Sequence, residues 1–116
     1  MPATILVVED EEPVADVISL LVQDLGHRVF TAPNGVEGLK IARREKPALV
    51  ISDIMMPQMP GDEMCRQLKS NPEYEGVKVI LMSAAGSRRA ADTGADAFLH
   101  KPFDLEAIEQ LVSRFT

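Results

Sequence analysis

The chain has 116 residues, of which 46% are hydrophobic and 26% are charged, and this length suits one domain with a single core. A net charge of −6, only 4% aromatic residues and no tryptophan argue against non-specific nucleic-acid binding and base-stacking surfaces. There is no apolar stretch of membrane-spanning length and no signal-peptide layout, and the single cysteine excludes an internal disulfide. We therefore expect one cytoplasmic domain over residues 1–116, with no membrane or direct nucleic-acid partner.

The first half of the chain alternates between strand-like and helix-like segments. Residues 4–8 form an apolar, β-branched run typical of a strand, and residues 14–25 carry an apolar stripe at helical spacing. Residues 28–31 predict a short second strand. Asn34 resembles a helix cap and predicts a second helix, which ends before the next proline.

The second half continues this alternation. Residues 48–53 predict a third strand, followed by a loop rich in proline and glycine and then by a third helix. Residues 77–82 predict a fourth strand and residues 96–100 a weaker fifth one. Between these two strands only residues 87–93 are available for a helix, whereas the last helix has a good N-cap in Asp104.

Such alternation predicts βαβ units with right-handed crossovers, and hence an α/β fold whose parallel sheet is covered by helices on both faces. The run 48–53 supports this fold because it is mostly apolar, as expected of a strand that is buried on both faces. Ligands of open parallel sheets bind outside the carboxyl ends of the strands. The residues at these ends are therefore the first candidates for a site.

Polar side chains stand at four of the strand ends. Glu9 and Asp10 follow the first strand, Asp53 ends the third, and Ser83 and Lys101 follow the fourth and fifth. Three carboxylates at one edge of a sheet repel one another, and a divalent cation relieves this repulsion. Oxygen-only ligands at neutral pH favour Mg²⁺ as that cation.

These residue types suit phosphoryl transfer. Mg²⁺ neutralises charge on an incoming phosphoryl group, and Lys101 provides a compact cation for the opposite side of that group. Asp53 is then the candidate nucleophile, which forms an aspartyl phosphate. Ser83 offers a hydroxyl that can hydrogen-bond one phosphoryl oxygen.

At these residues the chain resembles the receiver domain of two-component response regulators, from about residue 4 to residue 115. Glu9-Asp10 matches the acidic metal-binding pair of the family, Asp53 matches its phosphoacceptor, and Pro57 with Gly61 matches the loop after the phosphoacceptor. Ser83 matches the switch hydroxyl and Phe98 the switch aromatic residue. Lys101-Pro102-Phe103 matches the Lys-Pro-Phe motif. Each feature alone is a weak signal, but all of them in this order and spacing form a strong one.

The resemblance implies a doubly wound, flavodoxin-like sheet of five parallel strands in the order 2-1-3-4-5. It also implies that Asp10, Asp53 and the backbone carbonyl of Met55 ligate Mg²⁺, with Glu9 in contact through water. The peptide bond before Pro102 is expected to be cis, a form that proline makes accessible.

The implied function is that of a phosphoacceptor, which takes a phosphoryl group onto Asp53 from a histidine kinase or phosphotransfer protein. Ser83 would then turn toward the phosphoryl group and Phe98 inward, which remodels a surface for a downstream protein target. The chain would catalyse only its own phosphorylation and dephosphorylation, and would not otherwise be an enzyme. Residues that select the kinase are expected on the first helix and in the loop after Lys101.

Two departures from the family pattern lead to further predictions. The chain between Ser83 and Lys101 is shorter than usual by about one helical turn. This predicts a short or mobile fourth helix, and a monomer or weak dimer in place of the usual dimer. Met55 and Ala85, two residues after Asp53 and Ser83, cannot orient an attacking water, which predicts slow spontaneous dephosphorylation.

Two other functions match parts of the pattern. A phosphatase resembling haloacid dehalogenases also forms an aspartyl phosphate, but it needs a second acid two residues after the nucleophile, where this chain has Met55. A pseudo-receiver, which binds proteins without being phosphorylated, would have lost an acid or the lysine, and none is missing here. The short fourth helix nevertheless keeps this alternative open. Arg88-Arg89 is interpreted as a solvated pair.

Overall fold

The computed structural model describes residues 2–116 and contains one sheet of five parallel strands. The strands are β1 (Thr4–Val8), β2 (Arg28–Ala32), β3 (Leu49–Asp53), β4 (Lys78–Ser83) and β5 (Ala97–His100). Their order in the sheet, β2-β1-β3-β4-β5, is the order that we expected. The predicted strand bounds agree with the observed ones to within one residue at either end.

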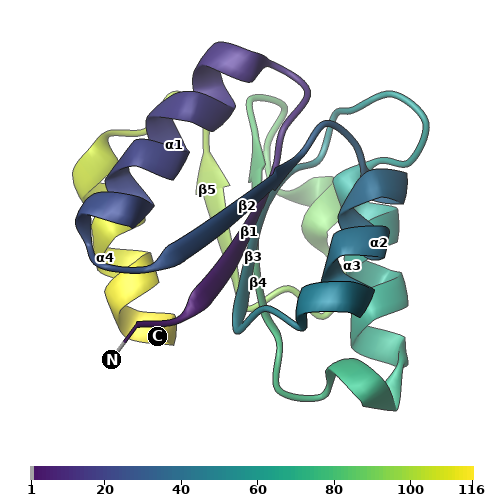
Figure 1. The fold of residues 1–116 in the computed structure, drawn as a ribbon. Coiled ribbons are helices and arrows are strands. Elements are labelled where there is room, and N and C mark those ends of the chain that lie inside the picture. Colours follow the sequence, from purple (N-terminus) through teal and green to yellow (C-terminus); the bar gives the residue numbers. More distant parts are fainter. Residues whose placement is uncertain (1) are drawn as a thin grey trace.

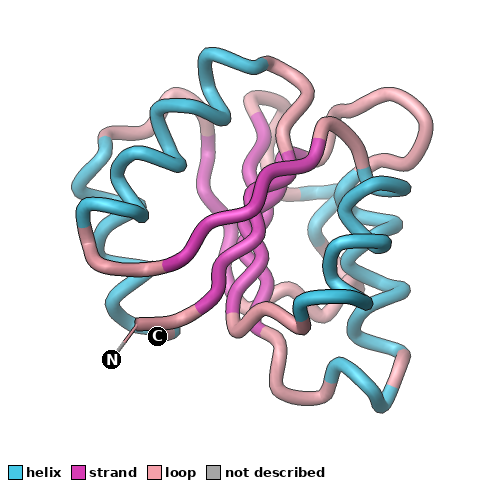
Figure 2. The backbone as a smooth tube through the Cα atoms, in the orientation of Figure 1, coloured by secondary structure: helices cyan, strands magenta, loops and turns pink. Residues whose placement is uncertain are grey.

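Helices cover both faces of this sheet (Figure 1). The α-helices are α1 (Glu12–Asp24), α2 (Gly35–Glu45), α3 (Gly61–Ser70) and α4 (Leu105–Phe115), and the short 3-10 helices are η1 (Pro72–Tyr74) and η2 (Arg88–Ala90). Figure 2 shows the strands in the middle, with α1 and α4 on one side and α2 and α3 on the other. The predicted doubly wound α/β fold is confirmed. No helix within residues 2–116 is long and apolar enough to cross a membrane.

The core consists of two apolar layers, one on each face of the sheet. Successive side chains of a strand point to opposite faces, so Ile5 and Val7 pack in the layer under α1 and α4. Leu6 and Val8 pack in the layer under α2 and α3. All residues of β3 are buried, as expected of a strand covered on both faces. Each large aliphatic side chain buried in these layers contributes about 1.5–3 kcal/mol to folding.

Local hydrogen bonds fix the starts of two helices as predicted. The side chain of Asn34 accepts a hydrogen bond from the N–H of Glu37 at 2.9 Å. The side chain of Asp104 accepts one from the N–H of Ala107, also at 2.9 Å. Pro13 lies in the first turn of α1. Proline is tolerated there because backbone N–H groups in the first turn make no hydrogen bond within the helix.

The crossover from β4 to β5 contains η2 in place of an α-helix, which confirms the predicted short fourth helix. Gly86, Asp92 and Gly94 have φ angles of +93°, +60° and +83°, in the left-handed region that a right-handed helix excludes. The segment is therefore built of turns.

Candidate functional site

The parallel register brings the predicted site residues to one edge of the sheet. Asp53 ends β3 and pairs with β4, while Ser83 ends β4 and pairs with β5. Glu9 and Lys101 directly follow β1 and β5. The site is therefore assembled from the carboxyl ends of neighbouring strands, as the strand pattern indicated.

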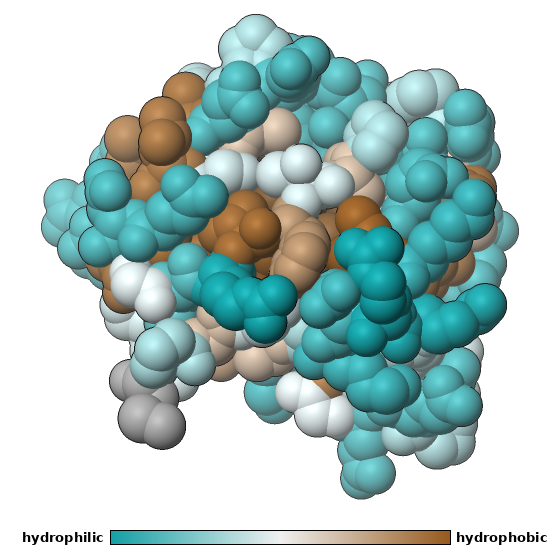
Figure 3. Space-filling model, viewed as in Figure 1, coloured by the Kyte–Doolittle hydropathy of each residue, from teal (hydrophilic) through white to brown (hydrophobic). Residues whose placement is uncertain are grey.

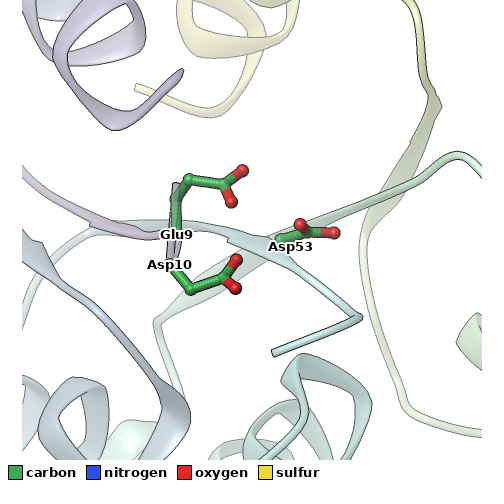
Figure 4. A group of neighbouring side chains, drawn as sticks. All are labelled: Glu9, Asp10 and Asp53. Carbon is green, nitrogen blue, oxygen red and sulfur yellow. The ribbon is translucent and has the colours of Figure 1, made fainter. Parts of the chain in front are cut away.

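Three carboxylates converge beside the ends of β1 and β3 (Figure 4). One oxygen from each of Glu9, Asp10 and Asp53 lies within 4.8 Å of the others. Glu9 and Asp53 are buried, whereas Asp10 is exposed. The cluster thus offers oxygen ligands only, and it reaches the surface at Asp10.

Lys101 is the basic partner of this cluster. Its Nζ donates to Glu9 Oε1 at 3.0 Å and to Asp53 Oδ2 at 3.1 Å. The backbone N–H of Lys101 donates to the carbonyl of Ser83 at 2.9 Å, and the following peptide bond to Pro102 is cis, as predicted. One lysine thus pairs with two buried carboxylates, which leaves the negative charge of the acids incompletely balanced.

Burial changes the protonation of these groups. Burial raises the pKa of Glu9 from 4.5 to about 7, although hydrogen bonds from Lys101 and from the Glu11 N–H act in the opposite direction. Burial acts to lower the pKa of Lys101, but hydrogen bonds to Glu9 and Asp53 outweigh it, so this pKa is raised above its ordinary value of 10.5. Lys101 therefore stays charged at neutral pH, while Glu9 lies near the midpoint of its titration.

The other predicted residues lie around this cluster. Ser83 is buried, and its Oγ accepts the N–H of Ala85 at 3.0 Å, so the hydroxyl is engaged by the segment that follows β4. Within residues 2–116 no hydrogen bond joins Ser83 to Asp53. Met55 is 54% exposed in the loop after β3. Phe98 is half-buried in β5 and packs against the core layer under α2 and α3.

The start of α3 packs closely against the end of β3. The N–H of Gly61 donates to the carbonyl of Ile54 at 2.9 Å. A Cβ at Gly61 would lie 2.0 Å from the carbonyl oxygen of Asp53, closer than any side chain can come. This close approach explains why α3 begins with a glycine.

Sequence reasoning missed an ion pair that lies next to the site. Arg89 donates from Nε and Nη2 to the two carboxylate oxygens of Asp62, each at 3.0 Å. Asp62 is buried in the first turn of α3. Arg89 is exposed, as expected of a solvated residue, but its ion pair with Asp62 was not anticipated from the sequence. The two partners are 27 residues apart, and no local pattern links them.

A comparison with known families decides the assignment. The family model for the response regulator receiver domain matches residues 5–113. The chain belongs to this family. The resemblance indicated by the strand-end motifs is confirmed, and this receiver domain carries the acidic cluster and the lysine at the carboxyl edge of its sheet.

Individual relatives agree with this assignment. The response regulator MprA of Mycobacterium sp. (strain KMS) is 38% identical over 116 residues, which cover 98% of the receiver domain and 49% of the relative. The chain spans about half the length of the curated relatives it matches.

Solved structures show the same fold. The signal receiver domain of a signal transduction histidine kinase from Syntrophus aciditrophicus is 31% identical, with a TM-score of 0.91 over 97% of this chain and 89% of that one. The chemotaxis response regulator CheY4 of Vibrio cholerae is 27% identical, with a TM-score of 0.90 over 100% of both chains. The receiver fold is therefore common to proteins in different signalling contexts.

Proposed function

We propose that this receiver domain accepts a phosphoryl group on Asp53, with the help of Mg²⁺, from a histidine kinase or phosphotransfer protein. The proposal is carried by one observation: Asp53, a buried strand-end carboxylate, contacts Lys101 inside a cluster with two further acids. A carboxylate so placed can act as a nucleophile, with a cation at hand for the charge of the phosphoryl group. Membership in a signalling family supports the same direction.

The donor set of the cluster fits magnesium. Mg²⁺ prefers oxygen ligands, and it is usually held by one or two carboxylates together with retained waters. In our proposal Asp10, Asp53 and the backbone carbonyl of Met55 would hold the ion, and Glu9 would contact it through water. When bound, the ion supplies positive charge for the phosphoryl oxygens.

The residues of the chain carry the transfer itself. A carboxylate oxygen of Asp53 forms a bond to phosphorus while the bond from phosphorus to the donor's histidine nitrogen breaks, and that nitrogen keeps the electron pair. Lys101, already 3.1 Å from Asp53, pairs with a phosphoryl oxygen. The Ser83 hydroxyl leaves the N–H of Ala85 and donates a hydrogen bond to another phosphoryl oxygen.

The new charge then acts on the segment after β4. A phosphoryl group adds about −1.5 to −2 charges at one place. Before phosphorylation the Ser83 hydroxyl accepts a hydrogen bond from the N–H of Ala85. Rotation of the Ser83 side chain breaks this hydrogen bond and releases the segment after β4, and Phe98 then turns inward. The altered surface around η2 and β5 binds a downstream protein target. With η2 in place of a full helix, we propose that the domain acts as a monomer or weak dimer.

An apolar hollow beside α1 is the proposed contact for the phosphodonor. It is lined by Pro13, Val14, Val17, Ile18, Phe103 and Leu105. Val17 and Leu105 are 47% and 46% exposed, and Figure 3 shows apolar residues on the surface in the area of α1. Phe103 also lines a second hollow that includes Lys101, so a helix docked here would reach the site.

Two further proposals concern the setting of this function. Cys65 is a free and buried thiol. We place the domain in the cytoplasm because thiols stay reduced there. We expect protein contacts rather than direct nucleic-acid binding as its output, because the chain carries a net charge of −6. Its catalysis would be limited to its own phosphorylation and dephosphorylation.

Intact mass measurement after incubation with acetyl phosphate and Mg²⁺ tests the proposal. We expect one added phosphate on the wild type and none on Asp53→Asn. The matched control is Asp24→Asn, which removes an exposed acid at the end of α1 and should still take up phosphate. A folded wild type that takes up no phosphate would favour the pseudo-receiver alternative, which the short η2 segment supports.

A further inference from the structure

The segment between β4 and β5 has little secondary structure to hold it in place. Residues 84–94, which we call the strap, contain only the three-residue helix η2, and three of their residues have positive φ angles. The backbone N–H groups of Ala90, Ala91 and Thr93 each donate to the carbonyl three residues earlier. Turns of this kind have little stability of their own, so the strap depends on side-chain contacts with the rest of the domain.

Arg89 and Asp62 form one such contact, near the carboxyl edge of the sheet. Nε and Nη2 of Arg89 donate to the two carboxylate oxygens of Asp62, each at 3.0 Å, and Nη1 contacts the sulfur of Met55. The Asp62 side chain is 8% exposed and lies in the first turn of α3, where the helix dipole favours a negative charge. A bidentate arginine–carboxylate pair is stronger and more restrictive than a single hydrogen bond. Arg89 therefore fastens η2 to the start of α3.

The other end of the strap is held by more contacts. Lys69, in the last turn of α3, donates from Nζ to Asp96 at 2.7 Å and to the carbonyl of Val77 at 2.9 Å. The N–H of Asp96 donates to the carbonyl of Val79 at 2.8 Å. The stem of Lys69 lies against Gly94, where a Cβ would be 3.0 Å from it. Loss of the contact at η2 would therefore free the strap beside the carboxyl edge and leave its entry into β5 in place.

The strap covers Cys65, the single cysteine of the chain. Cys65 lies on α3 and is fully buried in the core layer against which Ala90 of the strap also packs. Its Sγ donates to the carbonyl of Thr93 at 3.6 Å. Burial raises the pKa of the Cys65 thiol, and a protonated thiol reacts poorly. Cys65 is thus shielded while the strap is in place, and its reactivity can measure opening of the strap.

We propose that the Arg89–Asp62 pair is a latch, which holds the strap closed over Cys65 and sets how often the strap opens. Opening breaks this pair, and the glycines near the two ends of the strap, Gly86 and Gly94, let the backbone change direction. The latch acts in the resting domain and in this respect goes beyond the proposed function. Its role in signalling rests on the proposed function, because the proposed release of the segment after β4 would work against the latch.

Labelling of Cys65 tests the latch. Each protein, without a phosphodonor, is mixed with excess 5,5′-dithiobis(2-nitrobenzoate), and the release of thionitrobenzoate is followed. When the strap recloses faster than the reagent reacts, the labelling rate is proportional to the open fraction. The variants are Arg89→Ala and Asp62→Asn. Arg88→Ala is the matched control, because Arg88 is the neighbouring exposed arginine of η2 and makes no side-chain hydrogen bond or ion pair within the described residues.

The expected result is labelling about tenfold faster in Arg89→Ala than in the wild type, which corresponds to about 1.4 kcal/mol. Asp62→Asn should also label faster, because it keeps the shape of the side chain but removes the charge of the pair. Arg88→Ala should match the wild type. Equal rates in the wild type and Arg89→Ala, or an equal acceleration in Arg88→Ala, would overturn the inference.

Labelling in urea separates opening of the strap from unfolding of the whole domain. Local opening exposes little surface, so its rate should change little at low urea concentrations, whereas global unfolding depends steeply on urea. Arg66 lies 3.8 Å from Asp62, so the buried carboxylate keeps a cation in Arg89→Ala and the domain should keep its fold. If the faster labelling of Arg89→Ala rose with urea as steeply as global unfolding does, the pair would be merely structural and the latch would be overturned.

Phosphorylation tests the signalling role of the latch separately. Acetyl phosphate with Mg²⁺ should speed the labelling of Cys65 in the wild type but not in Asp53→Asn. Unchanged labelling in a wild type that carries phosphate would overturn that role. If the wild type takes up no phosphate at all, the proposed function fails, whereas the comparison of Arg89→Ala with the wild type in the resting state still decides the latch.

Discussion

Two acid–lysine networks lie at opposite ends of the sheet, and they differ in balance. At the carboxyl edge, Lys101 pairs with two buried acids, Glu9 and Asp53. At the amino edge, Asp96 lies just before β5. Its carboxylate accepts hydrogen bonds from Lys69 Nζ at 2.7 Å and from the backbone N–H of Val79 in β4 at 2.8 Å. The first network has more acids than bases, whereas the second satisfies one acid with several donors.

The pKa values of the two acids shift in opposite directions. Burial raises the pKa of Glu9 to about 7. Burial also acts to raise the pKa of Asp96, but hydrogen bonds from Lys69 and from the Val79 N–H outweigh it, and this pKa is lowered. An acid stabilises the fold in its charged form when its pKa is lowered and destabilises it when its pKa is raised. The amino edge thus supports the fold, while the carboxyl edge carries an electrostatic cost that a cation can relieve.

The largest expected effect comes from neutralising Glu9. Gln keeps the size of the side chain and an acceptor for Lys101 but removes the buried charge. Glu9→Gln should therefore raise the free energy of unfolding by about 2 kcal/mol at pH 8 without Mg²⁺. Between pH 4.5 and 7 the folded state binds more protons at Glu9 than the unfolded state, so stability falls as pH rises through this window. The advantage of the variant should disappear near pH 4.5, and urea unfolding at both pH values measures it.

The control for this prediction is Glu12→Gln. Glu12 is an exposed acid in the first turn of α1, and its substitution should change stability by no more than about 0.5 kcal/mol. If Glu9→Gln were less stable than the wild type at pH 8, the contact with Lys101 would outweigh the cost of burial. The proposed contrast between the two edges would then be lost.

Magnesium should relieve the same cost. A ligand at ten times its Kd that binds only the folded state raises the free energy of unfolding by about 1.4 kcal/mol. We expect such a gain in the wild type at pH 8, measured by urea unfolding with and without millimolar MgCl₂. Asp53→Asn should lose most of the gain, and Asp96→Asn should keep it. Equal stabilisation of all three proteins would indicate binding elsewhere.

The balanced network predicts the opposite sign for loss of charge. Asp96→Asn removes the charge-assisted bond to Lys69 but leaves an acceptor for Val79, so it should cost about 1 kcal/mol at pH 7. Because the folded pKa is lowered from 3.8, the contribution of Asp96 is present above pH 3.8 and is lost as pH falls through the folded value. The gap between wild type and variant should therefore close in acid, as denaturation curves along a pH series would show.

A neighbouring acid provides the control. Asp92 is exposed in the same crossover, and its φ of +60° is one that asparagine tolerates well. Asp92→Asn should leave stability unchanged. If Asp92→Asn lowered stability as much as Asp96→Asn does, the loss would come from the charge of the crossover segment and not from the contact between Asp96 and Lys69.

Local patterns and topology predicted a large part of this molecule. The caps at Asn34 and Asp104 were predictable because each accepts an N–H only three residues away. Asp53 and Lys101 are 48 residues apart, yet their meeting was also predictable. A parallel sheet aligns the ends of its strands, so residues at those ends become neighbours whatever their separation in the chain.

Contacts between loops and helix flanks were not predictable in this way. Asp62 with Arg89, and Lys69 with Asp96, are each 27 residues apart, and neither pair lies at two strand ends that the topology aligns. Each meeting depends on how the segment between β4 and β5 packs on α3. The pKa of Glu9 was equally out of reach, because it depends on how deeply the side chain is buried.

The smallest expected effect in free energy is local opening within residues 84–94. Their backbone hydrogen bonds are short-range: the N–H of Ala90 donates to Ser87, and that of Thr93 donates to Ala90. Isolated turns of this kind open at little cost, so these amides should exchange far faster than those of α1. Hydrogen exchange followed residue by residue measures this directly. Strong protection throughout the segment would contradict the prediction.

The same measurement distinguishes the two ends of the crossover. At the amino edge, the Val79 N–H is bonded to the Asp96 side chain and the Asp96 N–H to the Val79 carbonyl, each at 2.8 Å. These two amides should stay protected, and Asp96→Asn should speed the exchange of Val79 while leaving residues 84–94 unchanged. Arg89→Ala should do the reverse, since it frees the segment beside Asp53 and leaves the amino edge intact. Because the crossover starts at the unbalanced edge and ends at the balanced one, exchange should slow along it toward Asp96.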